Sequence, residues 1–180
     1  MEKYDVTKPI KIPVGMYKLN NDAGINFQLN RLVNLDGCDI SVAKEIGSTI
    51  KSAADFYDVL KKRADIELEK GHIKNAAALY RMSEFFTDWE DPNGLAAWKK
   101  ARELFFEYYK DFFGGEHPMV ELVNVPYENY NMPTLKFNAE DPKGNIVMHG
   151  GFDSSYEEFF AECEYLREHG YNVYLFEGPG

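Results

Sequence analysis

The sequence predicts an α/β protein, with an α-helical region followed by the first strands of an incomplete sheet. Two observations support this prediction. Apolar residues recur at helical spacing between Ser52 and Phe113, whereas after Pro118 short β-branched runs alternate with turn residues. The order strand, glycine turn, helix, strand then follows from Asn145 to Gly180. We therefore divide the chain into a helical, cap-like region, 1–117, and the beginning of an α/β core, 118–180.

In the helical region, the first twenty residues contain Pro9 and Pro13 and predict an extended arm. Two short helices should follow, one starting at Asp22 and ending before Asp36-Gly37, the other running from Asp39 to Ile46. Residues 28–31 (Gln-Leu-Asn-Arg) are polar on one side, which favours a solvated helix face over a pocket wall.

Three longer helices should complete this region. The first begins at a Ser52/Asp55 capping box and ends at Gly71. The second runs from Ile73 to about Asp88 and is apolar on two faces, with Trp89 continuing one of them. The third opens at Asp91-Pro92 and is ended by Gly114-Gly115.

The predicted strands are short and separated by turns, and lie at Val120–Val125, Thr134–Asn138, Ile146–Met148 and Val173–Phe176. A helix between the last two should start at a Ser154/Glu157 capping box and end at Gly170. Phe159, Cys163 and Leu166 would form its inward side. Cys38 and Cys163 are too few for a disulfide framework, and Cys163 should be a reduced core thiol.

Composition narrows the function classes. Thirty acidic and 20 basic residues among 180 give a formal charge of −10, which argues against nucleic acid or anionic membranes as partners. No apolar run approaches the ~20 residues of a membrane span, and the first five residues begin no signal peptide. We expect a cytoplasmic protein without metal or cofactor.

The stretch His149-Gly150-Gly151-Phe152-Asp153 follows a buried strand, where open α/β sheets bind ligands. It resembles the H-G-G loop of the α/β-hydrolase superfamily, and Glu177-Gly178-Pro179-Gly180 resembles that superfamily's D-x-P-G loop with Glu replacing Asp. The run from Gly150 to Glu158 is similar to a subgroup with a helical N-terminal region. That subgroup contains the 2,6-dihydroxypseudooxynicotine hydrolases and the fermentation-respiration switch esterases.

The resemblance implies roles for the residues of this turn. The Phe152 N–H would be one donor of the oxyanion hole, with Gly151 allowing close approach. Asp153 would position substrate or transfer a proton, or else cap the following helix. His149 and Gly150 would lie on the substrate-binding side, with His149 packed under the loop and hydrogen-bonded to backbone.

No G-x-S-x-G occurs in the chain, and Ser154 and Ser155 lack the context of a nucleophile. We therefore expect the front portion of a longer serine hydrolase for a small-molecule substrate, inactive by itself. An apolar sheet edge would favour a homo-oligomer. Two alternatives stay open: a dinucleotide-binding βαβ unit with Glu177 as the ribose-binding acid, or a helical protein-interaction module.

Overall fold

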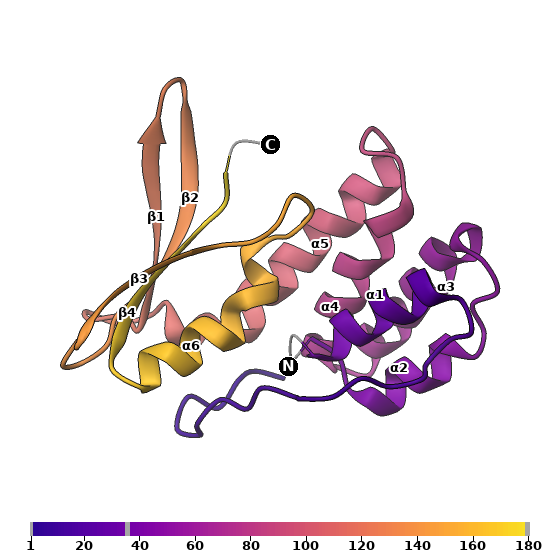
Figure 1. Ribbon diagram of the computed structural model, residues 1–180, viewed down its shortest axis with the longest axis horizontal. Coiled ribbons are helices and arrows are strands. Elements are labelled where there is room, and N and C mark those ends of the chain that lie inside the picture. Colours follow the sequence, from indigo (N-terminus) through magenta and orange to yellow (C-terminus); the bar gives the residue numbers. More distant parts are fainter. Residues whose placement is uncertain (1, 35–36, 179–180) are drawn as a thin grey trace. The chain divides into compact units, whose positions relative to one another are not determined.

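A computed structural model describes residues 2–34 and 37–178 and divides the chain into two compact units. The first comprises Met1–Tyr4 and Pro13–Tyr108, and the second Asp5–Ile12 and Tyr109–Gly180. The chain passes between them at Tyr4–Asp5, Ile12–Pro13 and Tyr108–Tyr109, and all three points lie inside the stretch 1–117 that the sequence predicts to be one region. The predicted fold class is confirmed, because helices precede a four-stranded mixed sheet (Figure 1).

The first unit is helical, as predicted. Its α3 helix begins at the expected capping box, where the Asp55 carboxylate accepts the Ser52 N–H at 3.0 Å. Phe56, Leu60 and Ala64 form its fully buried face. The elements of the unit are α1 Ala23–Asn34, α2 Ile40–Gly47, α3 Ala53–Glu69, α4 Ile73–Ser83, the 3-10 turn η1 Glu84–Phe86, and α5 Pro92–Tyr108.

The helix predicted to reach Asp88 ends earlier. α4 stops at Ser83 and the 3-10 turn η1 follows it, so the helical period no longer decides which side chains face inward. Trp89, expected on an inward face, is 87% exposed. That prediction is wrong.

Residues 28–31 also differ from expectation, because Asn30 is only 1% exposed. Its Oδ1 accepts the Tyr17 N–H at 2.6 Å and its Nδ2 donates to the Tyr17 carbonyl at 2.8 Å. One amide side chain thus satisfies both backbone groups of a residue in the extended arm, as a paired strand would. The polar side of α1 binds the arm instead of water.

The second unit is built around the sheet, whose strand order is β1-β2-β4-β3 (Figure 1). β1 pairs with β2 and β2 with β4 in antiparallel fashion, whereas β3 runs parallel to β4. The hairpin is longer than predicted and leaves only Glu128 and Asn129 in its loop, with Glu128 at a φ of 50°. The elements are η2 Lys110–Phe112, β1 Val120–Tyr127, β2 Tyr130–Phe137, β3 Gly144–His149, η3 Tyr156–Phe159, α6 Phe160–Glu168 and β4 Tyr171–Phe176.

The core of this unit centres on Phe160, the first residue of α6. Its ring centroid lies 4.2 Å from that of Tyr109, 5.2 Å from that of Phe112 and 5.1 Å from that of Phe137 in β2. Such close aromatic pairs contribute ~0.5–1.5 kcal/mol each beyond their buried area. This cluster fixes the start of α6 relative to the sheet, and so limits the length of the turn that precedes it.

The start of the helical segment is displaced by one residue from the prediction. Ser155 and Glu158, and not Ser154 and Glu157, form the capping box, and the single 3-10 turn η3 precedes α6. The buried side of α6 accordingly begins at Phe160 and includes Cys163 and Glu164, whereas Phe159 and Leu166 are only partly buried. Burial raises the pKa of the Glu164 carboxyl, although the Arg167 guanidinium binds both of its oxygens at 2.7 and 2.6 Å.

Candidate functional site

The turn His149–Asp153 lies where β3 ends and before η3 begins. Because β3 and β4 are parallel, with His149 opposite Phe176, the loops that follow them emerge at the same edge of the sheet. Ligands bind at this carboxyl edge in open α/β sheets. The sequence therefore placed its candidate residues correctly with respect to the strands.

Gly150 is the position in this turn that only glycine fits. A Cβ there would lie 2.5 Å from the Ser154 Cβ and 2.9 Å from a ring carbon of Phe159. At Gly151 the nearest atom to such a Cβ would be the Ser154 Oγ at 3.6 Å, an ordinary contact. Close packing within the turn thus requires glycine at Gly150, whereas the role expected of Gly151, allowing close approach to the Phe152 N–H, stays a prediction.

Ser154 holds the turn in shape from inside. Its Oγ accepts the Gly151 N–H at 3.0 Å, and its own N–H donates to the Gly151 carbonyl at 3.3 Å. Between these bonds lies the Phe152 N–H, for which the described part of the chain supplies no hydrogen-bond partner. The Phe152 side chain is fully exposed, at 108%. The turn therefore presents an unsatisfied backbone donor on a fixed scaffold.

Glu177 links the loop after β4 to the start of η3. Its carboxylate accepts the Tyr156 N–H at 3.0 Å, while its own N–H donates to the Pro133 carbonyl at 3.0 Å. This contact argues against the dinucleotide alternative, because the carboxylate proposed to bind a ribose is used to tether a helix start. Pro179 and Gly180, which complete the predicted loop motif, lie outside the described residues.

His149 donates from Nδ1 to the Gly150 carbonyl at 2.7 Å, which is the backbone hydrogen bond expected of it. Its ring centroid lies 5.6 Å from that of Phe176 on the neighbouring strand. The side chain is nonetheless exposed and does not pack under the loop. His149 therefore lines the solvent side of the turn.

Asp153 is exposed and directly follows Phe152. The cap of the following helix is Ser155, so the alternative in which Asp153 is the N-cap is not what the structure shows. Ser154 and Glu177 support this turn, a role that was not predicted from the sequence. Their signal was weak, since serine after glycine and glutamate after a strand are common in any α/β loop.

The two cysteines have no reactive character. Both are free and buried, and burial raises the pKa of the Cys38 and Cys163 thiols to about 12. The Cys163 thiol lies 3.6 Å from the Met148 sulfur in the core. A thiolate nucleophile at either position is therefore disfavoured.

Within residues 2–34 and 37–178, no group of three or more His, Cys, Asp or Glu side chains is placed to hold a metal ion. Within the same residues, no helix combines the length and apolar character needed to cross a bilayer.

No family model matches the chain, and no curated protein matches it. Among solved structures it resembles the chain described as AbyA5 wild type, with a TM-score of 0.66 and 15% identity over 89% of this chain. A second similar chain is a 2,6-dihydroxy-pseudo-oxynicotine hydrolase, with a TM-score of 0.46 and 19% identity over 83% of this chain. This chain spans 45% of the length of each. At such identity, the likeness to AbyA5 shows the fold alone.

Proposed function

We propose that this chain is the N-terminal part of an α/β-fold serine hydrolase, in which the turn His149–Asp153 supplies one donor of the oxyanion hole. The observation that carries the proposal is the Phe152 N–H, which has no partner among the described residues and lies in the loop between β3 and the next helix. In α/β hydrolases that loop contributes one of the two oxyanion donors. The reaction would be acyl transfer from an ester, an amide or a carbon–carbon bond of a small molecule.

Rigidity of the turn favours this role. A donor lowers the barrier only when it is aimed in advance at the developing negative charge, and removing one typically costs ~10²–10³ in turnover. Here Gly150 lets the chain approach Ser154 and Phe159 closely. Ser154 fixes Gly151 by hydrogen bonds to both its N–H and its carbonyl group. The Phe152 N–H is thus held in place before substrate arrives.

The nucleophile, acid and base belong to other residues of the parent protein. Ser154 Oγ accepts the Gly151 N–H, and Ser155 caps η3, so both serines have structural tasks. We expect the purified chain by itself to show no turnover of p-nitrophenyl esters above background. Asp153, exposed beside the donor, is the residue we assign to substrate positioning or proton transfer.

Several broader properties belong to the same proposal. We place the protein in the cytoplasm, acting on a small-molecule substrate. We also infer self-association through β3, an edge strand without charged residues or proline whose Val147 is exposed. Edge strands of this kind are templates for pairing.

An active-site label tests the proposal. Cells that naturally produce the protein are treated with a fluorophosphonate, which labels activated serines. Proteins recognised by an antibody against this chain are then isolated. We expect a labelled species heavier than the 20.7 kDa of this chain. If every species recognised has that mass and carries no label, the hydrolase proposal fails.

A further inference from the structure

The loop between η1 and α5 presents the most exposed tryptophan of the chain. Trp89 is 87% exposed, although tryptophan is on average a highly buried residue. Phe86 and Leu95, on either side of it in sequence, are also exposed large apolar residues. Three large apolar side chains are therefore exposed in this short segment of the helical unit.

Hydrogen bonds hold Trp89 in a tight turn. The Asp91 N–H donates to the Asp88 carbonyl at 2.9 Å, which places Trp89 and Glu90 at the two corners. The Asp88 carboxylate accepts the Glu90 N–H at 3.0 Å, and the Asp91 carboxylate accepts the Asn93 N–H in the first turn of α5 at 2.8 Å. The backbone around Trp89 is thus ordered by local bonds.

Packing fixes the base of this turn as well. A Cβ on Gly94 would lie 2.4 Å from the Thr87 Oγ1, so α5 meets the loop at a distance that only glycine allows. Phe86 packs edge-on against Phe56 of α3, with ring centroids 4.9 Å apart. Because the backbone of the turn is already ordered, binding through Trp89 costs little backbone conformational entropy.

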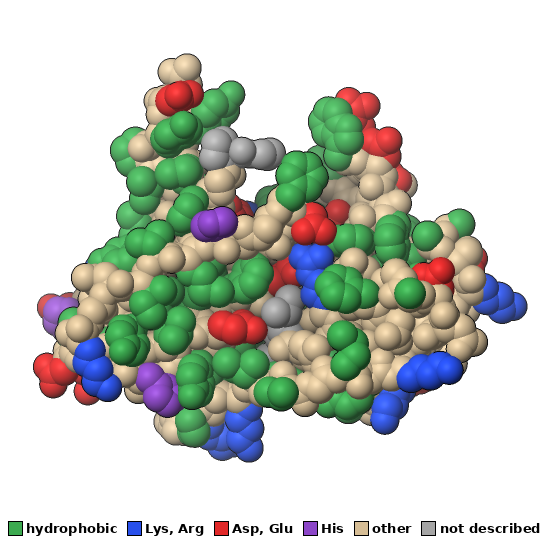
Figure 2. Space-filling view, in the orientation of Figure 1, with side chains coloured by type: hydrophobic (Ala, Val, Ile, Leu, Met, Phe, Trp, Pro, Cys, Tyr) green, Lys and Arg blue, Asp and Glu red, His purple; other side chains and the backbone are tan. Residues whose placement is uncertain are grey.

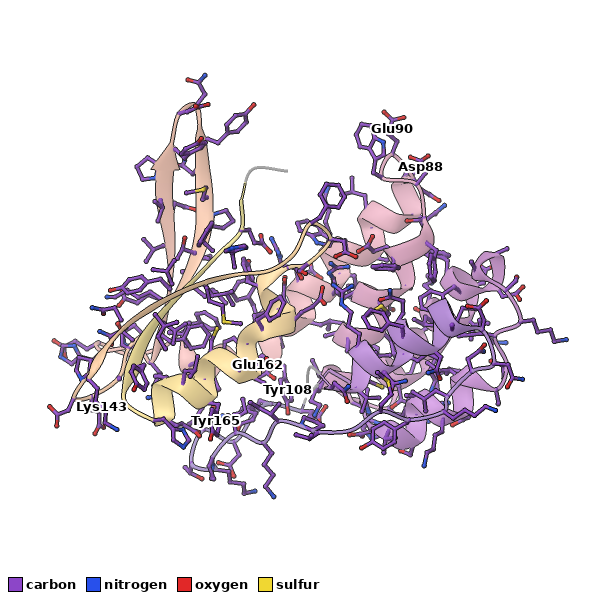
Figure 3. The ribbon with its side chains drawn as sticks, in the orientation of Figure 1. Asp88, Glu90, Tyr108, Lys143, Glu162 and Tyr165 are labelled. Carbon is purple, nitrogen blue, oxygen red and sulfur yellow. The ribbon has the colours of Figure 1, made fainter. Side chains whose placement is uncertain are left out.

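The charged residues nearest to Trp89 in sequence are acidic. Between Met82 and Trp98 the sequence contains four acidic residues, Glu84, Asp88, Glu90 and Asp91, and no lysine or arginine; of these, Glu84 forms an ion pair with Arg81 of α4. Asp88 and Glu90 lie at the outer end of the loop between α4 and α5 (Figure 3), where acidic side chains gather on this face (Figure 2). A surface that accepts Trp89 must therefore tolerate or neutralise negative charge.

We propose that the turn Asp88–Asp91, termed the Trp89 turn, docks onto a protein with an apolar pocket rimmed by lysine and arginine side chains. Trp89 is the anchor that fills the pocket, and Asp88 and Glu90 pair with the rim. Nucleic acids and anionic membranes are repelled by this charge. A second copy of the chain, with its formal charge of −10, offers fewer cations than a basic partner.

A chemical probe tests the recognition directly. β-Cyclodextrin with an ammonium group on every glucose unit is an apolar cavity with a cationic rim; unmodified and carboxymethylated β-cyclodextrin serve as comparators. Binding is followed at the indole N–H signals of the two tryptophans, assigned with Trp89→Phe. We expect the ammonium form to bind Trp89 about 10-fold more tightly than the neutral form at low salt, from several exposed ion pairs. Equal affinity for all three forms would overturn the proposal.

Photo-cross-linking then tests the docking in cells. p-Benzoylphenylalanine replaces Trp89 in one variant and Phe27, which is 56% exposed on α1, in the control. We expect one dominant adduct at position 89, mapped to an apolar surface lined by lysine or arginine, and about 10-fold less of it with Asp88→Asn and Glu90→Gln. These changes remove charge but keep the Asp88 Oδ1 acceptor position. Docking to a basic partner would be refuted by an adduct with a second copy or with the protein's own chain. It would also be refuted by adducts with the same targets as position 27, or by no adduct at all.

Discussion

Two tight turns of this molecule expose an aromatic side chain next to carboxylates, yet they are built for different ends. At the turn His149–Asp153, Phe152 is fully exposed and its backbone N–H has no partner among the described residues. At the Trp89 turn, the N–H groups of Glu90, Asp91 and Asn93 are bonded to Asp88 and Asp91, whereas the Trp89 N–H also lacks a partner among the described residues. Both turns leave the N–H of their exposed aromatic residue open, but the first turn follows β3 at the carboxyl edge of the sheet, where ligands bind, and the second joins η1 to α5 outside the sheet.

The difference shows how the surroundings of a turn indicate its use. A catalytic donor needs a fixed peptide and close approach, which explains Gly150 beside Ser154 and Phe159. An anchor for a partner needs a large apolar side chain on an ordered base, which explains Gly94 against Thr87. The critical glycine lies two residues before Phe152 in the first turn and five residues after Trp89 in the second.

The largest effect should come from Gly150 in the parent hydrolase. Gly150→Ala pushes a Cβ into Ser154, displaces the Phe152 N–H and should lower kcat by ~10²-fold or more. Gly151→Ala is the matched control and should stay within a few-fold, because its Cβ has room. Steady-state kinetics on both variants, with melting curves to confirm folding, decide the matter. Equal losses in the two variants would contradict the assigned role of Gly150.

Gly94→Ala should have the next largest effect, now on stability. The added Cβ meets the Thr87 Oγ1, and such overpacking costs ~1–3 kcal/mol of unfolding free energy. Thr87→Ala removes the clashing oxygen, so the double variant should recover part of this loss. Urea unfolding of both singles and the double gives the coupling energy. Additive losses would show that Thr87 and Gly94 do not support the Trp89 turn together.

A smaller effect separates the two serines after the glycine turn. Ser155→Ala removes the cap of η3 and should cost ~1 kcal/mol. Ser154→Ala leaves the Gly151 N–H to exposed solvent and should change stability by less than ~0.5 kcal/mol. If Ser154→Ala instead lowered the unfolding free energy in urea more than Ser155→Ala, the capping box first predicted from the sequence, at Ser154, would be the correct one.

The smallest effect is expected from the exposed aromatics themselves. Trp89→Ala and Phe152→Ala should each leave the unfolding free energy within ~0.5 kcal/mol, because neither side chain is buried. Thermal and urea unfolding measure this. A loss well above that value at either position would mean that the side chain stabilises the fold and is not held for a ligand.

Much of the fold could be predicted because its signals are local. Capping residues, glycine stops and the change of period after Pro118 placed the helices and the four strands close to where they are found. The boundaries shifted where the chain leaves an ideal element, as at η1 after Ser83 and at η3 before Phe160. In each case a 3-10 turn replaces one turn of α-helix, and the periodicity no longer predicts the inward side.

The candidate site was predictable in place but not in mechanism. The glycines after an apolar strand marked the turn, yet which glycine is sterically required depends on Ser154 and Phe159 folding back onto Gly150. The site assignments of Phe152, Gly151, Asp153, His149 and Gly150 stay predictions for the experiments above.

The sequence by itself determined the order of elements, the negative charge and the position of the glycine turn, because these follow from neighbours in the chain. Tertiary structure alone decided that Asn30 is buried against the extended arm, that Trp89 is left in solvent, and that Glu177 tethers Tyr156. Each of these depends on partners far apart in sequence, or on the absence of any. Residue type and spacing do not indicate such partners. A polar residue can therefore be buried and an aromatic one exposed without any change in the periodicity of the sequence around them.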